Sequence, residues 1–195
     1  MATAAEELPG RFKLDVHAYH RMAEAGIFDD ARRVELIEGE IIEMPPIGPR
    51  HLNLVNRLNR ALVSAAGERA VVSVQNPVLL PEHSQPEPDL VLFRPEVDAR
   101  GEAMPVASDI LLAIEVADST SRYDLDVKVP LYAAHGVPEV WIVDVRAQRI
   151  DRFVGPGEHG YASSDAPALS SPLSLAAAPD ILVALSGLFD QRGTA

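Results

Sequence analysis

The run Ile110-Leu111-Leu112-Ala113-Ile114-Glu115-Val116 has the composition of a buried strand, and one carboxylate interrupts it. Strand alternation predicts two faces, one with Leu111, Ala113, Glu115 and Ala117 and the other with Ile110, Leu112, Ile114 and Val116. A buried carboxylate costs free energy unless a cation pairs with it or it holds a metal. Because two alanines share its face, we expect Glu115 to have room for other groups beside it.

A second carboxylate opens an earlier apolar run, Asp89-Leu90-Val91-Leu92-Phe93, directly after Pro88. Asp89 and Glu115 are 26 positions apart, so they meet only if their two strands are neighbours in the sheet. Two adjacent carboxylates repel, which raises the pKa of at least one of them unless a cation lies between them. Mg²⁺ accepts one or two carboxylates and leaves its other positions to water and phosphate oxygens.

Lys128 follows the two acids and adds a cation. Each residue taken alone also has an interpretation without a function. Asp89 could be an acid in a turn after a proline, Glu115 a strand residue in a salt bridge, and Lys128 a solvated lysine on a helix. In this order the three residues support one another as parts of one site.

The remaining elements alternate around these acids. Asp15 is expected to cap a helix that runs through Ala25, a long helix spans residues 49–66, and a third helix ends near residue 135. Pro130 lies inside that third helix, so either the helix starts late or it bends there. The predicted strands are residues 34–37, 40–44, 70–74, 78–80, 89–93, 110–116, 140–143, 149–154 and 173–175.

Three further local predictions complete this pattern. Glu38-Gly39 is expected to turn a tight hairpin, residues 155–172 form a loop or an exposed ribbon, and residues 180–189 form a short helix. The order of the elements, with a helix between two of the strands, indicates an α/β or α+β sheet protein.

Length and composition set broad limits. The 195 residues, 47% of them hydrophobic and 24% charged, suit one globular domain. We expect a flexible lead-in over residues 1–10, a single domain over residues 11–190 and a tail over residues 191–195. The absence of cysteine excludes disulfides and thiolate zinc sites. The chain shows neither a signal-peptide pattern nor an apolar run of about 20 residues, so we expect no membrane association and a cytoplasmic location.

The formal net charge of −12 argues against a general surface for binding polyanions. Acids that gather a divalent cation would make part of that charge functional. A local groove lined by Arg50, Arg57, Arg60 and Arg69 is one way to meet phosphate, although we favour simple solvation of a helix surface by these arginines.

Several motifs together carry a resemblance to a known family. The pattern of Pro88-Asp89, Glu115-Val116-Ala117 and Lys128 resembles the PD-(D/E)xK nuclease superfamily. The run from Glu115 to Ser121, then Asp124, Lys128, Tyr132 and the string Gly136 to Asp144, is similar to the Uma-type putative restriction endonuclease family. The likeness extends to Glu35-Leu36-Ile37-Glu38-Gly39-Glu40 and to His51, and it covers most of residues 12–190.

The resemblance implies a restriction-endonuclease-like fold, with a mixed central β-sheet flanked by helices and additional β-hairpins. It implies that Asp89 and Glu115 hold one or two Mg²⁺ ions, with Mn²⁺ as a substitute, and that Glu35 adds an outer carboxylate. Lys128 would orient the attacking water or neutralise charge on the scissile phosphate of a DNA substrate. Ala117 occupies the position where the superfamily has its lysine, and Lys128 is implied to reach into that space from the following helix. The resemblance also allows a homodimer.

The roles of four nearby residues stay open. Gln75 either positions water or substrate or satisfies backbone groups at a strand end, and His51 either lines the site or bonds near a helix start. Asp124 either caps the Lys128 helix, which we favour, or fixes the lysine. Tyr132, like Trp141, is expected in the core.

Three functions remain in view. The first is a Mg²⁺-dependent DNA endonuclease, which we favour. The second is a non-catalytic binding or regulatory module on the same fold. The third is a metal-dependent hydrolase of a smaller phosphoester, which an acidic surface would tolerate better.

Overall fold

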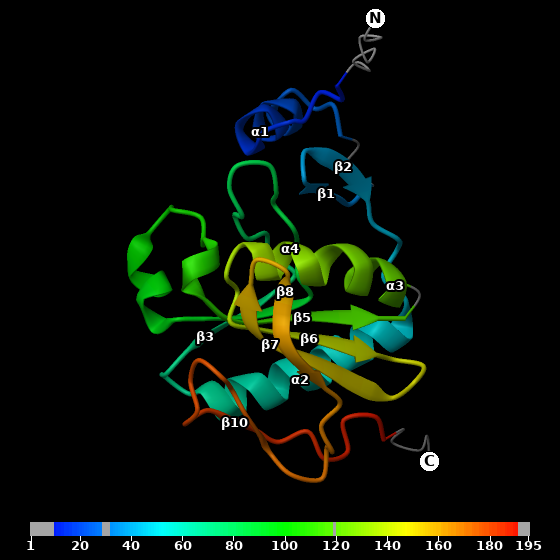
Figure 1. Ribbon diagram of the computed structural model, residues 1–195, viewed down its shortest axis with the longest axis vertical. Coiled ribbons are helices and arrows are strands. Elements are labelled where there is room, and N and C mark those ends of the chain that lie inside the picture. Colours follow the sequence, from blue (N-terminus) through cyan, green and yellow to red (C-terminus); the bar gives the residue numbers. More distant parts are fainter. Residues whose placement is uncertain (1–9, 29–31, 119, 191–195) are drawn as a thin grey trace, which may run out of the picture.

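A central sheet of six strands organises the computed structural model, which describes residues 10–28, 32–118 and 120–190 (Figure 1). Strands β5 and β6 are parallel, and every other neighbouring pair is antiparallel. The predicted mixed sheet is therefore confirmed. In spatial order the strands are β3 (Val71–Val74), β4 (Leu90–Phe93), β5 (Ile110–Ala117), β6 (Glu139–Asp144), β7 (Arg149–Gly157) and β8 (Gly160–Asp165).

Helices cover both faces of this sheet (Figure 1). The long helix α2 (Pro49–Ala66) packs Leu58 and Leu62 into one core cluster with Leu112 of β5, and α4 (Val129–Ala134) packs Tyr132 into the other with Ala113. The remaining helices are α1 (Val16–Glu24), α3 (Ser121–Tyr123) and the short 3₁₀ segments η1 (Pro95–Arg100) and η2 (Ala107–Asp109). No helix in the described ranges is both long enough and apolar enough to cross a membrane.

The predicted hairpin forms a separate two-stranded sheet, β1 (Val34–Ile37) with β2 (Glu40–Glu43). Its turn residues Glu38 and Gly39 have φ values of 48° and 81°, as a tight hairpin turn requires. A backbone bridge between Leu36 and Gln85 joins the hairpin to the loop before β4. Through this contact, β1 is held beside the end of the central sheet.

The connection from β5 to β6 settles the question about Pro130. The helix begins well before the proline, at Ser121, and includes a π-helical segment, η3 (Asp124–Lys128), before α4. The amide of Val129 bonds to the carbonyl of Asp124, five residues back. A π-helical turn widens the helix, so the missing amide of Pro130 falls where the regular bonding pattern is already interrupted.

Two predictions about strands are wrong. A register shift between Leu92 and Phe93 inserts an extra residue in β5, so Leu111 packs with the α2 cluster and Ile110 with the α4 cluster, opposite to the expected alternation. Residues 78–80 make isolated bridges to residues 84 and 106 in place of a strand.

The expected helix over residues 180–189 is likewise absent. The segment pairs β9 (Leu173–Ser174) with β10 (Leu182–Val183) and continues in turns. Ile181, Val183 and Leu185 are buried while Leu182 and Ala184 are exposed, which is the period of an extended chain. The predicted strand at residues 173–175 and the exposed ribbon, which is formed by β7 and β8, are present. Residues 1–9 of the expected lead-in and the tail over residues 191–195 lie outside the described part of the chain.

Candidate active site

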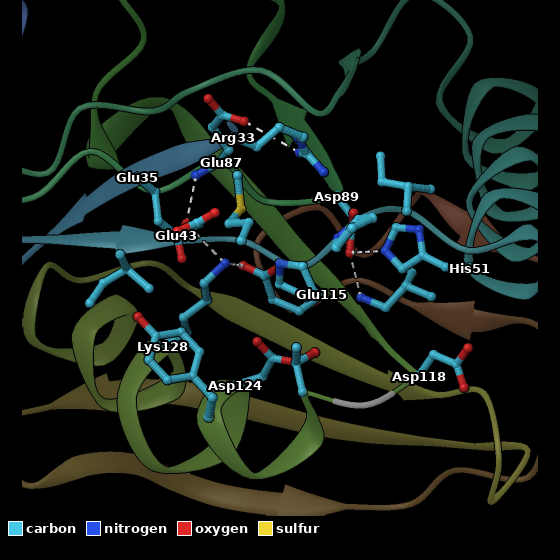
Figure 2. Close-up of a pocket in the computed structure, with 18 of the residues that line it drawn as sticks. Arg33, Glu35, Glu43, His51, Glu87, Asp89, Glu115, Asp118, Asp124 and Lys128 are labelled. Carbon is cyan, nitrogen blue, oxygen red and sulfur yellow. Dashed lines mark hydrogen bonds and ion pairs between the residues drawn. The ribbon is translucent and has the colours of Figure 1, made fainter. Parts of the chain in front are cut away.

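A cavity of about 320 Å³ opens beside the ends of β4 and β5 (Figure 2). One part of its wall is apolar and comes from the segment between β2 and α2, including Met44, Pro45 and Ile47. The rest is ionisable. Seven carboxylates line it against two side chains of fixed positive charge, Arg33 and Lys128; the carboxylates are Glu35, Glu43, Glu87, Asp89, Glu115, Asp118 and Asp124.

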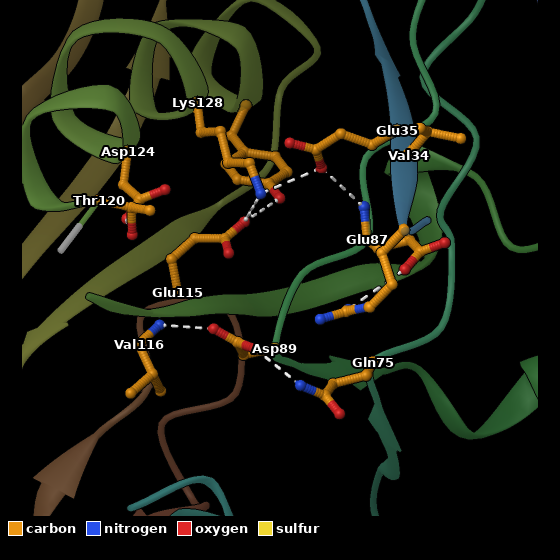
Figure 3. Close-up of polar contacts among 12 residues, drawn as sticks. Val34, Glu35, Gln75, Glu87, Asp89, Glu115, Val116, Thr120, Asp124 and Lys128 are labelled. Carbon is orange, nitrogen blue, oxygen red and sulfur yellow. Dashed lines mark hydrogen bonds and ion pairs between the residues drawn. The ribbon is translucent and has the colours of Figure 1, made fainter. Parts of the chain in front are cut away.

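Asp89 and Glu115 come together because their strands are neighbours. The antiparallel register pairs Leu90 with Ile114, which places Asp89, one residue earlier, beside Glu115. The amide of Val116 donates to Asp89 Oδ2 at 2.8 Å (Figure 3). The two strands are therefore neighbours in the sheet, as a shared site for Asp89 and Glu115 requires.

Lys128 points into the cavity from η3. Its Nζ lies 3.2 Å from Glu115 Oε1 and 3.1 Å from Glu35 Oε2, so it bridges the central sheet and the hairpin (Figure 3). The lysine side chain is 5% exposed, and those of Glu35 and Glu115 are 1% and 4% exposed. The ammonium therefore reaches Glu115 from the helix, and Ala117 lies two residues after Glu115 on β5.

Tyr132 also contacts Glu115, which the sequence did not predict. It is fully buried, as expected of a core residue, but its hydroxyl donates to Glu115 Oε1 at 2.7 Å. The signal available in the sequence was its spacing, because Tyr132 follows Lys128 by four residues and so shares a helix face with it.

Asp124 does not cap the helix, contrary to the favoured prediction. The N-cap residue of α3 is Thr120, and its hydroxyl donates to Asp124 Oδ2 at 2.7 Å. Asp124 begins η3 one turn later, is buried and lines the cavity. It therefore adds negative charge beside Lys128.

His51 and Gln75 both support Asp89. His51 Nε2, near the start of α2, lies 2.9 Å from Asp89 Oδ2, and the amide of Gln75 donates to Asp89 Oδ1 at 3.1 Å. Both oxygens of Asp89 are thus held in place. His51 thus lies near a helix start and also lines the cavity, so each of the two interpretations given for it is correct in part.

Glu35 has a second donor besides Lys128. The backbone amide of Glu87 donates to Glu35 Oε2 at 3.2 Å (Figure 3), and the Glu87 side chain pairs with Arg33 at 3.4 Å (Figure 2). Glu87 and Arg33 also line the cavity, and no motif in the sequence pointed to them.

Burial and crowding shift the proton equilibria here. Burial raises the pKa of Glu115 well above its usual value, and the charges of Asp124, Asp89 and Glu35 raise it further against the opposing effect of Lys128. Burial also raises the pKa of Asp124. Burial alone would lower the pKa of Lys128, but Glu115, Glu35 and Asp124 outweigh it and raise that pKa above its ordinary value. The cluster thus holds its lysine charged and favours a proton on an acid.

The donor chemistry fits a hard divalent cation. In the described residues, no three His, Asp or Glu side chains are arranged as a ready metal-binding group. Mg²⁺ does not require one, because it takes one or two carboxylates and keeps several waters. Asp89 and Glu115 are two adjacent carboxylates on one cavity, and the excess of acids over fixed cations leaves negative charge to be balanced.

None of the four arginines considered for a phosphate groove, on or just after α2, lines this cavity. Arg57 donates to the backbone carbonyls of Leu188 and Asp190, and Arg69 pairs with Asp180. They anchor the C-terminal segment on the α2 side of the sheet. Of all the arginines whose side chains the structure describes, Arg33 lines the candidate site.

A mixed six-stranded sheet with helices on both faces carries this cluster of acids and a lysine. The sequence model of the Uma2 family, described as putative restriction endonucleases, matches residues 16–186. This chain belongs to the Uma2 family, and that membership supports a nuclease-like function.

A solved structure agrees with this assignment at the level of the fold. The crystal structure of a putative nuclease of the DUF820 group from Anabaena variabilis superposes with a TM-score of 0.65. The two chains are 17% identical, and the match covers 86% of this chain and 96% of the other. No curated protein matches the chain.

Proposed function

We propose that this protein is a metal-dependent endonuclease that hydrolyses phosphodiester bonds of DNA. The observation that carries the proposal is the contact of Lys128 with Glu115 in a cavity that Asp89 also lines. Two carboxylates and an ammonium at one cavity supply the groups that phosphodiester hydrolysis needs.

Each residue has a role in this proposal. Asp89 and Glu115 would hold Mg²⁺ or Mn²⁺, which when bound supplies an activated water and stabilises negative charge at phosphorus. Lys128 orients the attacking water or neutralises charge on the scissile phosphate. Glu35 fixes the lysine, and Tyr132 fixes Glu115 through the hydrogen bonds described above.

Cleavage assays on supercoiled plasmid and on single-stranded DNA test the proposal directly. The wild-type protein should cut at least one of these substrates with Mg²⁺ or Mn²⁺ and should not cut in excess chelator. Asp89→Asn, Glu115→Gln and Lys128→Met should each reduce the rate by about 10²-fold or more, since each removes a group that acts in the transition state. Wild-type rates in all three variants would contradict the proposed site.

Matched controls separate loss of chemistry from loss of fold. Lys13, the only other lysine in the chain, is exposed, so Lys13→Met controls for Lys128→Met. Glu40 is an exposed glutamate paired with Arg11, so Glu40→Gln controls for Glu115→Gln. Both control variants should cleave at the wild-type rate.

A smaller phosphoester is the second candidate substrate. The volume of about 320 Å³ lies at the small end of ligand pockets, and the acidic lining does not favour a long polyanion. Turnover of bis(p-nitrophenyl) phosphate by the same three residues, without cleavage of either DNA substrate, would favour this function.

A further inference from the structure

Two buried side-chain polar atoms have no hydrogen-bond partner in the part of the chain that the structure describes. They are the hydroxyl of Tyr123, on α3, and Nδ1 of His51, on α2. Both residues line the cavity that holds Asp89, Glu115 and Lys128. A buried polar group without a partner destabilises a fold. Two such atoms at one cavity therefore suggest contacts that a ligand completes.

The other tyrosines make the contrast clear. The chain has four tyrosines. The other three hydroxyls all donate a hydrogen bond. Tyr19 donates to Val34 O at 2.9 Å, Tyr132 to Glu115 Oε1 at 2.7 Å and Tyr161 to Val137 O at 2.8 Å. Tyr123 alone among the four has a buried hydroxyl with nothing to bond to.

The Tyr123 hydroxyl is suited to donate to an anion. Burial and the charge of Glu35 raise its pKa, so the hydroxyl keeps its proton at neutral pH. Lys128 has three N–H donors and spends two on Glu35 and Glu115, which leaves one for a ligand. A ligand that only accepts hydrogen bonds, such as a phosphate group, matches these donors.

The rest of the cavity narrows the ligand class. The wall that includes Met44, Pro45 and Ile47 is apolar and offers a surface for a sugar or a base. The volume of about 320 Å³ suits one nucleotide unit and not a paired duplex. His51 Nε2 lies within hydrogen-bond distance of Asp89 Oδ2, so Nδ1 is the ring nitrogen left to contact a bound hydroxyl or water.

Building on the proposed nuclease function, we propose that the cavity takes a single unpaired nucleotide. The Tyr123 hydroxyl donates to a non-bridging oxygen of its phosphate, and His51 Nδ1 forms a second contact with the bound nucleotide or its water. Tyr123 is thus a binding residue for the substrate phosphate.

Tyr123→Phe tests this inference by moving stability and binding in opposite directions. Loss of an unpaired hydroxyl should raise Tm by roughly 2–4 °C. The same change should weaken binding of thymidine monophosphate, measured calorimetrically with Ca²⁺, by about tenfold. Tyr161→Phe is the matched control: it removes a paired hydroxyl, so it should lower Tm and leave nucleotide binding unchanged. A lower Tm with unchanged binding in Tyr123→Phe would show a structural role and overturn the inference.

A spectroscopic measurement gives an independent readout. Tyrosine labelled with ¹³C at Cζ should give four signals, and Tyr123→Phe identifies the one of interest. Adding the nucleotide to Ca²⁺-saturated protein should shift the Tyr123 signal and leave that of Tyr161 in place. If Ca²⁺ alone caused the whole shift, the hydroxyl would be in contact with the hydrated cation, and the proposed phosphate contact would be overturned. Failure of the wild-type protein to bind the nucleotide would also overturn it.

His51→Gln tests the second contact. The glutamine amide takes the place of Nε2 and can still donate to Asp89, while the Nδ1 position is lost. We expect weaker nucleotide binding, and unchanged binding would remove His51 from the inference. These measurements need no cleavage, so nucleotide binding without any DNA cleavage would count against the nuclease proposal alone.

Discussion

Lys128 Nζ and Glu115 Oε1 form an ion pair of 3.2 Å, and both side chains are almost completely removed from solvent. The pair joins the helical connection after β5 to β5 itself. The same ammonium pairs with Glu35 on the hairpin, so one lysine links three separate elements. A buried charge of this kind is costly to leave without its partners.

Lys128→Met should destabilise the protein by about 3–5 kcal/mol, because it leaves two buried carboxylates without their cation. Urea unfolding followed by circular dichroism would measure the change in free energy of unfolding. Lys13→Met should leave that free energy within about 0.5 kcal/mol of the wild-type value, because Lys13 is exposed. A loss below about 1 kcal/mol in Lys128→Met would mean that the ion pairs contribute little in solution.

The Lys128 ammonium should stay protonated above the ordinary lysine pKa of 10.5, because Glu115, Glu35 and Asp124 outweigh the effect of burial. The chain has two lysines, so ¹⁵N-lysine labelling gives two side-chain signals. Titration in the folded state and again in urea would compare the two states of Lys128. An equal or lower pKa in the folded state would contradict the charge balance described for the cavity.

Glu115→Gln should flatten the dependence of stability on pH. The pKa of Glu115 is raised in the folded state, so the folded protein binds more protons and its stability falls as pH rises from about 4.5 through the raised pKa. The glutamine variant cannot ionise and should lose less stability across that range. Tm measured from pH 4.5 to 8 would show this, with Glu40→Gln expected to follow the wild-type curve.

Tyr132→Phe should destabilise the protein by about 1–3 kcal/mol, because it removes a hydrogen bond to the buried Glu115 carboxyl group. Its hydroxyl is the neutral donor to Glu115, at 2.7 Å. Chemical denaturation would measure the loss. An unchanged free energy of unfolding would indicate that Lys128 alone is sufficient to hold Glu115.

Binding of Mg²⁺ should become tighter as pH rises. If the metal binds as proposed, Glu115 must release the proton that its raised pKa favours, so protons compete with the cation. Calorimetry in two buffers with different ionisation enthalpies would detect the released proton near neutral pH. Equal enthalpies in both buffers would argue that Glu115 binds no metal or is already ionised.

The sequence predicted those parts of the fold that local chemistry determines. Asp15 accepts from the amide of Ala18 as an N-cap, the long helix runs from Pro49 to Ala66, and Glu38-Gly39 forms the hairpin turn. Alternation along β5 also placed Glu115 correctly beside Ala113, because the bulge lies earlier in the strand. Each of these features depends on a few adjacent residues.

The parts that depend on distant contacts could not be predicted. The helix expected over residues 180–189 is absent, and the segment that replaces it is anchored by Arg57 and Arg69, more than 100 positions earlier. The contacts of Asp89 with His51 and Gln75 also join separate elements. The candidate site followed a family pattern for its acids and lysine, whereas the hydrogen bond of Tyr132 to Glu115 and the unpaired hydroxyl of Tyr123 depend on the three-dimensional arrangement. Whether the four predicted residues are catalytic stays a prediction.

The separate hairpin has a consequence for how the cavity is assembled. Glu35 belongs to β1, whose strand pairing is with β2 and not with the central sheet. A local opening that frees the hairpin would therefore remove one carboxylate from Lys128 and leave Glu115 in place on β5. The charge around the lysine would change by one unit while the six-stranded sheet stays folded. Assembly of the complete cluster is thus an equilibrium of its own, superimposed on the folding of the domain.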